Sequence, residues 1–199
     1  MNPRVVLALS LLCALALGAV ILAARGGKAD DSESASSAFD GALMPRNVRA
    51  PDFDLRDEYG KRISMRSFRG KPVVVTFLYT HCRNTCPAQA QTARGALDDL
   101  GHDVPAIAIS VDPARDTRAS ARAFLSKQHA LGRIHFVLGT FKQLDPLWKG
   151  FAILPQRPTV EHIARFTLVD KRGFQRIGFP GDQATPERLA HDLKLLERE

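Results

Sequence analysis

The chain has 199 residues, a hydrophobic fraction of 45% and a formal net charge of +7 at pH 7. This hydrophobic fraction suffices for a globular core, so folding requires neither a metal nor a disulfide. No recognised nucleic-acid-binding motif accompanies the positive charge, which argues against a nucleic-acid-binding protein. Between positions 60 and 83 there is no acidic residue, and this basic stretch favours an acidic protein partner or anionic lipid head groups (Lys61, Arg62, Arg66, Arg69, Lys71, Arg83).

The chain begins with an apolar segment and a polar linker. Residues 5–24 carry no charge and are long enough to span a bilayer, which predicts an uncleaved N-terminal membrane anchor within residues 1–25. Cleavage of a signal peptide after Ala24 is the alternative. Residues 26–50 include the stretch KADDSESASS, which is poor in large apolar side chains, and they predict a flexible linker before a folded domain at residues 51–199.

Within residues 51–199, predicted strands alternate with predicted helices. A hairpin at 52–64 comes first, and the further strand candidates are 73–79, 106–111, 134–138, 166–169 and 174–179, the last pair forming a second hairpin. The predicted helices are about 87–100, 118–129 and a C-terminal helix with Thr185 as N-cap and Pro186 in its first turn. This alternation predicts an α/β fold with a central mixed sheet and helices on both faces.

Cys82 and Cys86 follow the predicted strand at 73–79 and are separated by three residues. A position beyond the carboxyl end of a strand and at the start of a helix is typical of ligand sites, and it lowers thiol pKa values. His81 and Arg83 add positive charge, so reactive thiolates are expected. A purely structural disulfide is disfavoured, because so short a loop contributes only about 2 kcal/mol. Cys13, inside the apolar segment, is expected to be an inert hydrophobe.

Two functions remain open for this cysteine pair. On one face of a helical segment, sulfurs at i and i+4 could form a disulfide or bind one soft ion such as Cu(I) or Zn(II). A third metal ligand would come from elsewhere in the chain, and histidine is the natural candidate. His162 lies in irregular chain before a strand, where a structural or surface role is the default. Three other histidines are interpreted as surface residues (His102, His129, His191), and His135, in a predicted strand, as a core or edge residue.

Two further groups of residues have structural interpretations. Asp112, Pro113, Asp116 and Thr117 are of the types that dominate turns and helix caps, with partner binding as the less favoured reading. Trp148 and Phe151, at helical spacing, are expected to pack in the core.

The segments YTHCRNTCP, SVDPARDT and VEHIARFTLVD, in this order, resemble the Sco/SenC family of copper proteins that help to assemble cytochrome c oxidase. The resemblance runs from about Pro51 to the C-terminus and includes APDFDLRDEYGKRIS and GKPVVVTFLYT. It implies a thioredoxin-like fold in which Cys82, Cys86 and His162 hold copper as Cu(I) or Cu(II). Family members often have Pro-Asp after the first cysteine, where this chain has Arg83-Asn84, so the local charge differs.

The resemblance implies a metallochaperone, tethered to the bacterial inner membrane with its folded domain on the periplasmic side. Its copper would go to the binuclear site of cytochrome c oxidase subunit II or to another recipient. The alternative is a thiol-disulfide oxidoreductase that keeps oxidase or other extracytoplasmic cysteines reduced, with Cys82 and Cys86 as the redox pair and a thioredoxin-type reductant behind it. His162 distinguishes the two functions, because only copper binding uses it.

Overall fold

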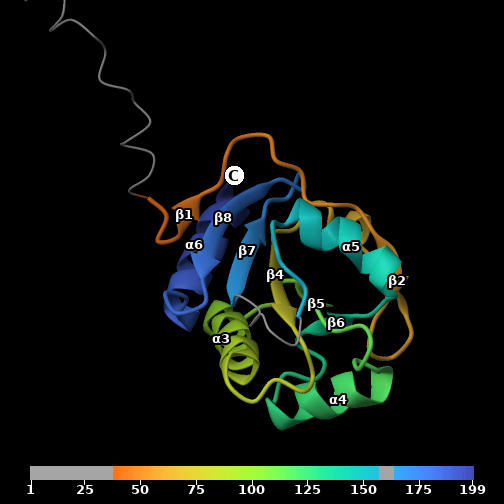
Figure 1. The fold of residues 1–199 in the computed structure, drawn as a ribbon. Coiled ribbons are helices and arrows are strands. Elements are labelled where there is room, and N and C mark those ends of the chain that lie inside the picture. The colour runs from red at the N-terminus through yellow and green to blue at the C-terminus, as the bar shows by residue number, and fades with distance from the viewer. Residues whose placement is uncertain (1–37, 157–163) are drawn as a thin grey trace, which may run out of the picture. The chain divides into compact units, whose positions relative to one another are not determined.

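A mixed sheet lies at the centre of the fold in this computed structural model, which describes residues 38–156 and 164–199 (Figure 1). The strands are β1 (Ala42–Leu43), β2 (Asp54–Arg56), β3 (Arg62–Ser64), β4 (Val73–Leu78), β5 (Ala106–Ser110), β6 (His135–Val137), β7 (Arg165–Val169) and β8 (Gln175–Pro180). The sheet has the order β1-β8-β7-β4-β5-β6, and β2 and β3 form a separate hairpin. Strands β4, β5 and β6 run parallel, whereas β7 is antiparallel to both β4 and β8, so the predicted mixed sheet is confirmed.

Helices cover both faces of this sheet. In the described residues they are η1 (Met65–Phe68), α3 (Thr85–Leu100), α4 (Arg118–Lys127), α5 (Phe141–Gly150) and α6 (Pro186–Arg198). Successive side chains of the fully buried β4 point to opposite faces of the sheet, so they belong to two separate core layers. Val74 and Leu78 pack with side chains of α3, α4 and α6, while Val75 and Phe77 pack with α5 and the β2–β3 hairpin (Figure 1).

Local signals in the sequence set the ends of these helices. Gly101 ends α3 in the left-handed conformation, with φ of 71°. Thr117, Thr140 and Thr185 begin α4, α5 and α6, and each side-chain oxygen accepts a hydrogen bond from a backbone N–H in the first turn. Pro186 occupies the first turn of α6, as predicted.

Helix α5 has no counterpart among the predicted elements. Pro146 stands inside it, and an interior proline ordinarily argues against a helix. Tertiary contacts hold the helix in place: the Trp148 indole N–H donates to the Ser110 carbonyl oxygen at 2.9 Å, and the Phe151 ring meets Phe77 edge to face at 5.4 Å. The expectation that Trp148 and Phe151 lie in the core is confirmed.

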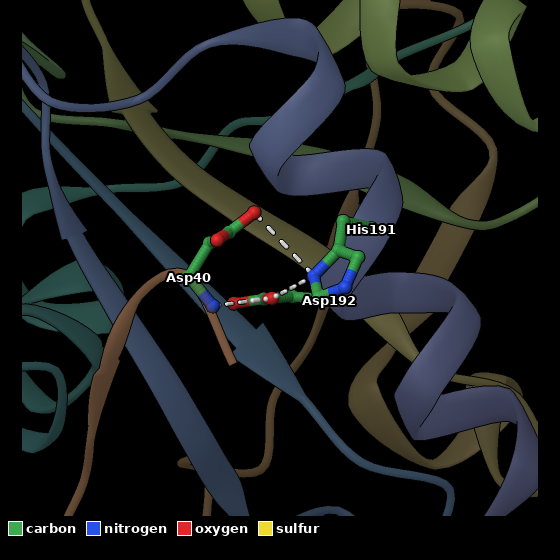
Figure 2. Close-up of side chains that lie close together, drawn as sticks. All are labelled: Asp40, His191 and Asp192. Carbon is green, nitrogen blue, oxygen red and sulfur yellow. Dashed lines mark hydrogen bonds and ion pairs between the residues drawn. The ribbon is translucent and has the colours of Figure 1, made fainter. Parts of the chain in front are cut away.

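The N-terminal part of the described chain joins the sheet. Strand β1 pairs with β8, and farther on the Ala50 amide donates to the Gly173 carbonyl at 3.0 Å. Both oxygens of the buried Asp192 carboxylate on α6 accept backbone N–H groups, from Asp40 at 2.8 Å and Gly41 at 2.9 Å (Figure 2). The folded unit therefore starts at Phe39, inside the segment assigned from the sequence to the flexible linker.

The predicted membrane anchor, residues 5–24, lies outside the described residues. None of the helices in residues 38–156 and 164–199 has the length and apolar character that crossing a membrane requires.

Candidate functional site

Cys82 and Cys86 lie where β4 gives way to α3. Strand β4 ends at Leu78, a short loop follows, and α3 starts at Thr85. The Cys82 amide donates to the Tyr79 carbonyl oxygen at 3.2 Å, which folds this loop back toward the strand. Both cysteines are buried and carry free thiols, with no disulfide between them. The structure thus brings together the two described members of the predicted site.

The Cys82 sulfur caps the N-terminus of α3. Asn84 holds the N-cap position but makes no side-chain capping hydrogen bond. Instead the Cys86 amide, in the first turn of α3, donates to the Cys82 sulfur at 3.2 Å. The Thr85 hydroxyl lies 3.7 Å from the same sulfur. A thiolate at this position receives both hydrogen bonds and the positive potential of the helix N-terminus.

The two thiols differ in acidity. Burial acts to raise the pKa of Cys82, but hydrogen bonds from the Cys86 side chain and amide, the Asn84 amide and the Thr85 hydroxyl outweigh it and lower that pKa. Burial raises the pKa of Cys86 far above its ordinary value, and the neighbouring Cys82 sulfur adds to the effect. The lowered pKa of Cys82 agrees in direction with the expected thiolate, whereas the raised pKa of free Cys86 runs against it, because Cys86 is fully buried.

Asp116 braces the cysteine loop from a distance in sequence. Its Oδ1 accepts hydrogen bonds from the Thr80 amide and hydroxyl, each at 2.8 Å, and its Oδ2 accepts one from the Ser110 hydroxyl at 2.6 Å. Burial raises the pKa of Asp116, while these hydrogen bonds act in the opposite direction. Asp116 thus fastens the loop after β4 to the end of β5.

From its residue type, Asp116 is expected in a turn or at a helix cap. Its hydrogen bonds to the cysteine loop were not predicted from the sequence. Its neighbours do follow the turn-and-cap interpretation. Thr117 forms a capping box with Ser120, and the Asp116 amide closes a turn on the Asp112 carbonyl oxygen at 2.9 Å.

A groove of about 700 Å³ opens beside Cys82, between the cysteine loop and α4. Pro87 and Phe124 give it apolar walls, and His81, Arg83 and Lys127 give it basic ones. Arg83 and the five other members of the predicted basic stretch are exposed to solvent. Of these six residues, only Arg83 lines the groove beside Cys82, where it lies with His81 and Lys127.

His162, the third predicted ligand, lies outside the described residues. The structure describes the chain on both sides of position 162, up to residue 156 and from residue 164. Both described ends lie at the carboxyl ends of β4 and β5, the end of the sheet that carries the cysteine loop. The Gln156 amide donates to the Val111 carbonyl oxygen at 2.9 Å, just beyond β5. On the other side β7 starts at Arg165, and its residue Phe166 pairs with Thr76 near the carboxyl end of β4.

The sheet, its two helical layers and the paired thiols at a strand-to-helix junction define an α/β protein of thioredoxin-like fold. A model of the SCO1/SenC family matches residues 42–197. The chain therefore belongs to the SCO1/SenC family.

Comparison with individual relatives agrees with this assignment. The protein SenC of Rhodobacter capsulatus is 34% identical over 154 residues, which cover 71% of this chain and 67% of SenC. The mitochondrial protein SCO2 of Saccharomyces cerevisiae is 29% identical over 134 residues, 61% of this chain and 44% of SCO2. The matched region is thus less than half of the yeast protein.

Solved structures of the family share the fold. Bradyrhizobium japonicum ScoI with copper bound is 30% identical, with a TM-score of 0.60 over 74% of this chain and 99% of ScoI. A SCO1/SenC family lipoprotein of Bacillus anthracis is 26% identical, with a TM-score of 0.68 over 78% of this chain and 99% of the lipoprotein. Copper binding and cytochrome c oxidase assembly are properties named for members of this family.

Proposed function

We propose that this chain is a copper metallochaperone in which Cys82, Cys86 and His162 bind the cargo ion. The observation that carries the proposal is the pair of free thiols in one buried site at the N-terminus of α3. Thiolate sulfur is a ligand suited to Cu(I), and two thiolates with a neutral imidazole give a compact three-ligand set. The copper-bound ScoI structure of a relative that is 30% identical supports copper as the cargo.

The two sulfurs would contribute to binding in different ways. The lowered pKa of Cys82 favours the thiolate form that binds the ion. The raised pKa of Cys86 keeps its proton in place, so ion binding at Cys86 releases a proton into solution. Copper affinity is therefore expected to fall as the pH is lowered.

The described chain around position 162 supports its role as the third ligand. Gln156 bonds to the chain just beyond β5, and β7 begins beside the carboxyl end of β4, so both described ends of the chain around position 162 lie at the end of the sheet that carries the cysteine loop. A neutral imidazole is a common partner of thiolates in three-ligand and four-ligand metal sites.

A copper titration of the full chain tests the ligand set. We expect one Cu(I) per wild-type chain, measured by competition with a chromophoric chelator. Cys82→Ser, Cys86→Ser and His162→Ala should each weaken binding by at least about tenfold. His129→Ala is the matched control, because His129 lies in the loop after α4 and is no proposed ligand. Unchanged affinity in His162→Ala would remove His162 from the ligand set.

We further propose that residues 5–24 anchor the chain in the bacterial inner membrane and that its folded domain faces the periplasm. The recipient would be the binuclear copper site of cytochrome c oxidase subunit II, and the basic groove beside Cys82 suits an acidic face on that recipient. Mixing the copper-loaded chain with the copper-free soluble domain of subunit II tests the transfer. Its rate should fall as the salt concentration rises.

A thiol-disulfide oxidoreductase is the second candidate, and the unequal acidity of the two thiols favours it. A thiolate at Cys82 could attack a substrate disulfide, and the Cys86 thiol could then resolve the mixed disulfide. His162→Ala separates the two functions, because it should weaken copper binding and leave disulfide exchange intact. Loss of both activities would contradict this division of roles.

A further inference from the structure

Apart from the cysteine pair, the described residues contain two clusters of three metal-ligating side chains. In each cluster one ligand atom per residue lies within 4.8 Å of the others. The first cluster is Asp40, His191 and Asp192, and the second is Asp57, Glu58 and His135. The hydrogen bonds of the two clusters distinguish them.

The first cluster is accounted for by its structural role (Figure 2). Both Asp192 oxygens accept backbone amides from the segment that leads into β1. The His191 Nδ1 atom lies 3.0 Å from Asp192 Oδ1 and 3.4 Å from Asp40 Oδ2. Every group already has a partner within the protein, so this cluster needs no ligand.

The second cluster joins the β2–β3 turn to the outer strand β6. Asp57 Oδ1 accepts the Tyr59 and Lys61 amides, each at 2.9 Å, and shapes the turn. Glu58 Oε2 accepts the Phe136 amide of β6 at 2.7 Å. His135, the first residue of β6, places its Nδ1 atom 3.5 Å from Asp57 Oδ2.

Two buried polar atoms of this second cluster have no hydrogen-bond partner among the described residues, Glu58 Oε1 and His135 Nδ1. Glu58 has an exposed fraction of 0% and Asp57 one of 2%. A buried carboxylate oxygen without a partner is costly, and two adjacent buried carboxylates add mutual repulsion. Burial raises the pKa of Glu58 most strongly, and the charge of Asp57 raises it further. The hydrogen bonds that Glu58 accepts lower this pKa.

Among the described residues no lysine or arginine side chain pairs with either carboxylate. Two guanidinium groups donate to backbone carbonyl oxygens of this turn instead, Arg122 to Glu58 and Arg56 to Gly60, each at 2.7 Å. The imidazole of His135 is partly exposed, and its Nδ1 atom reaches the buried Asp57 carboxylate. Within the part of the chain that the structure describes, the charge of the two carboxylates is therefore not balanced by a lysine or an arginine.

We propose that Asp57, Glu58 and His135 form a binding site for a divalent first-row transition ion, with Zn²⁺ as the probe. Two carboxylates and a neutral imidazole balance a charge of 2+, and they offer the oxygen and nitrogen ligands that borderline divalent ions prefer. The cluster has no sulfur ligand, so its chemistry differs from that of the Cys82–Cys86 pair. A bound ion would connect the β2–β3 hairpin to β6. The hairpin already contacts the chain just after β6, where the Leu138 amide donates to the Arg56 carbonyl oxygen at 2.9 Å.

The test uses the full chain with Cys82→Ser and Cys86→Ser, which removes the competing thiols. We expect saturable binding of one Zn²⁺ by calorimetry and a rise in melting temperature of at least about 5 °C at a Zn²⁺ concentration of about 100 Kd. Adding Glu58→Gln keeps an oxygen for the Phe136 amide and removes the charge, and adding His135→Asn removes the imidazole. Each should weaken Zn²⁺ binding by at least about tenfold.

His191→Asn in the same background is the matched control, because it makes the same change in the first cluster. It should leave Zn²⁺ affinity unchanged, and so should His162→Ala. Far-ultraviolet circular dichroism verifies folding, and Glu58→Gln alone decides the question if His135→Asn does not fold. Absence of saturable Zn²⁺ binding, or equal affinity with Glu58→Gln, would overturn the proposal. The site is independent of the copper function, so Glu58→Gln in the wild-type chain should leave Cu(I) affinity unchanged.

Discussion

The sulfur atoms of Cys82 and Cys86 are close neighbours with opposite shifts in pKa. Cys82 receives hydrogen bonds at a helix N-terminus, whereas Cys86 is enclosed by the core. In the proposed function, Cys82 would therefore be the nucleophile and the first metal-binding atom, and Cys86 the partner that reacts after it.

This difference predicts the order of alkylation. Iodoacetamide should modify Cys82 well before Cys86, because the thiolate is the reactive form and the pKa of Cys82 is lowered. As the pH falls, modification of Cys82 should persist below the pH at which an ordinary cysteine loses reactivity. Mass spectrometry of peptides over a pH series measures both rates. Equal rates at the two cysteines would contradict the assignment.

Loss of the Asp116 carboxylate should loosen the cysteine loop. In Asp116→Ala the Thr80 amide, the Thr80 hydroxyl and the Ser110 hydroxyl all lose their acceptor. We expect the free energy of unfolding in urea to fall by about 2–3 kcal/mol. Asp112→Ala is the matched control, since its carboxylate pairs mainly with the half-exposed Arg115, and it should cost less than about 1 kcal/mol.

At the scale of helices and strands, the elements that could be predicted carry local signals. The apolar run at 73–79 became β4, and Gly101 and Thr185 mark helix ends in the structure as they do in the sequence. Helix α5 escaped prediction because Pro146 interrupts its pattern. A usable signal was nevertheless present, the capping box formed by Thr140 and Gln143.

The conformation of Gly101 predicts how substitutions there affect stability. An added Cβ would meet no atom within 4 Å, so the cost of Gly101→Ala comes only from its φ of +71°. We expect Gly101→Ala to destabilise the protein by about 1 kcal/mol, which lowers the melting temperature by about 2–4 °C. Gly101→Asn should cost less, because asparagine tolerates this conformation better. Equal melting temperatures for the wild type and Gly101→Ala would contradict the argument.

The candidate site divides in the same way between local and distant contributions. The position of Cys82 and Cys86 at a strand-to-helix junction follows from neighbouring sequence, so it could be predicted. The raised pKa of Cys86 depends on side chains that the fold packs around it. The contact between Thr80 and Asp116 joins residues 36 positions apart, and no local pattern reveals such a pair.

At the scale of the whole molecule, residues 39–50 belong to the folded unit. We expect a chain that begins at Pro51 to be less stable than one that begins at Phe39, by at least about 2 kcal/mol in urea unfolding. The shorter chain lacks β1, and it leaves the buried Asp192 carboxylate without the Asp40 and Gly41 amides (Figure 2). Equal stability of the two chains would show that this segment contributes nothing.

The sulfur cap on α3 links the chemistry of the site to the backbone. Any bond that Cys82 forms, to a metal or to another sulfur, changes the charge on the atom that accepts the hydrogen bond from the Cys86 amide. That single amide proton is therefore a built-in gauge of occupancy: its nuclear magnetic resonance frequency and its exchange with solvent deuterium should both change when the thiol is engaged. In the proposed function, copper loading could thus be followed on the protein itself, without any added dye.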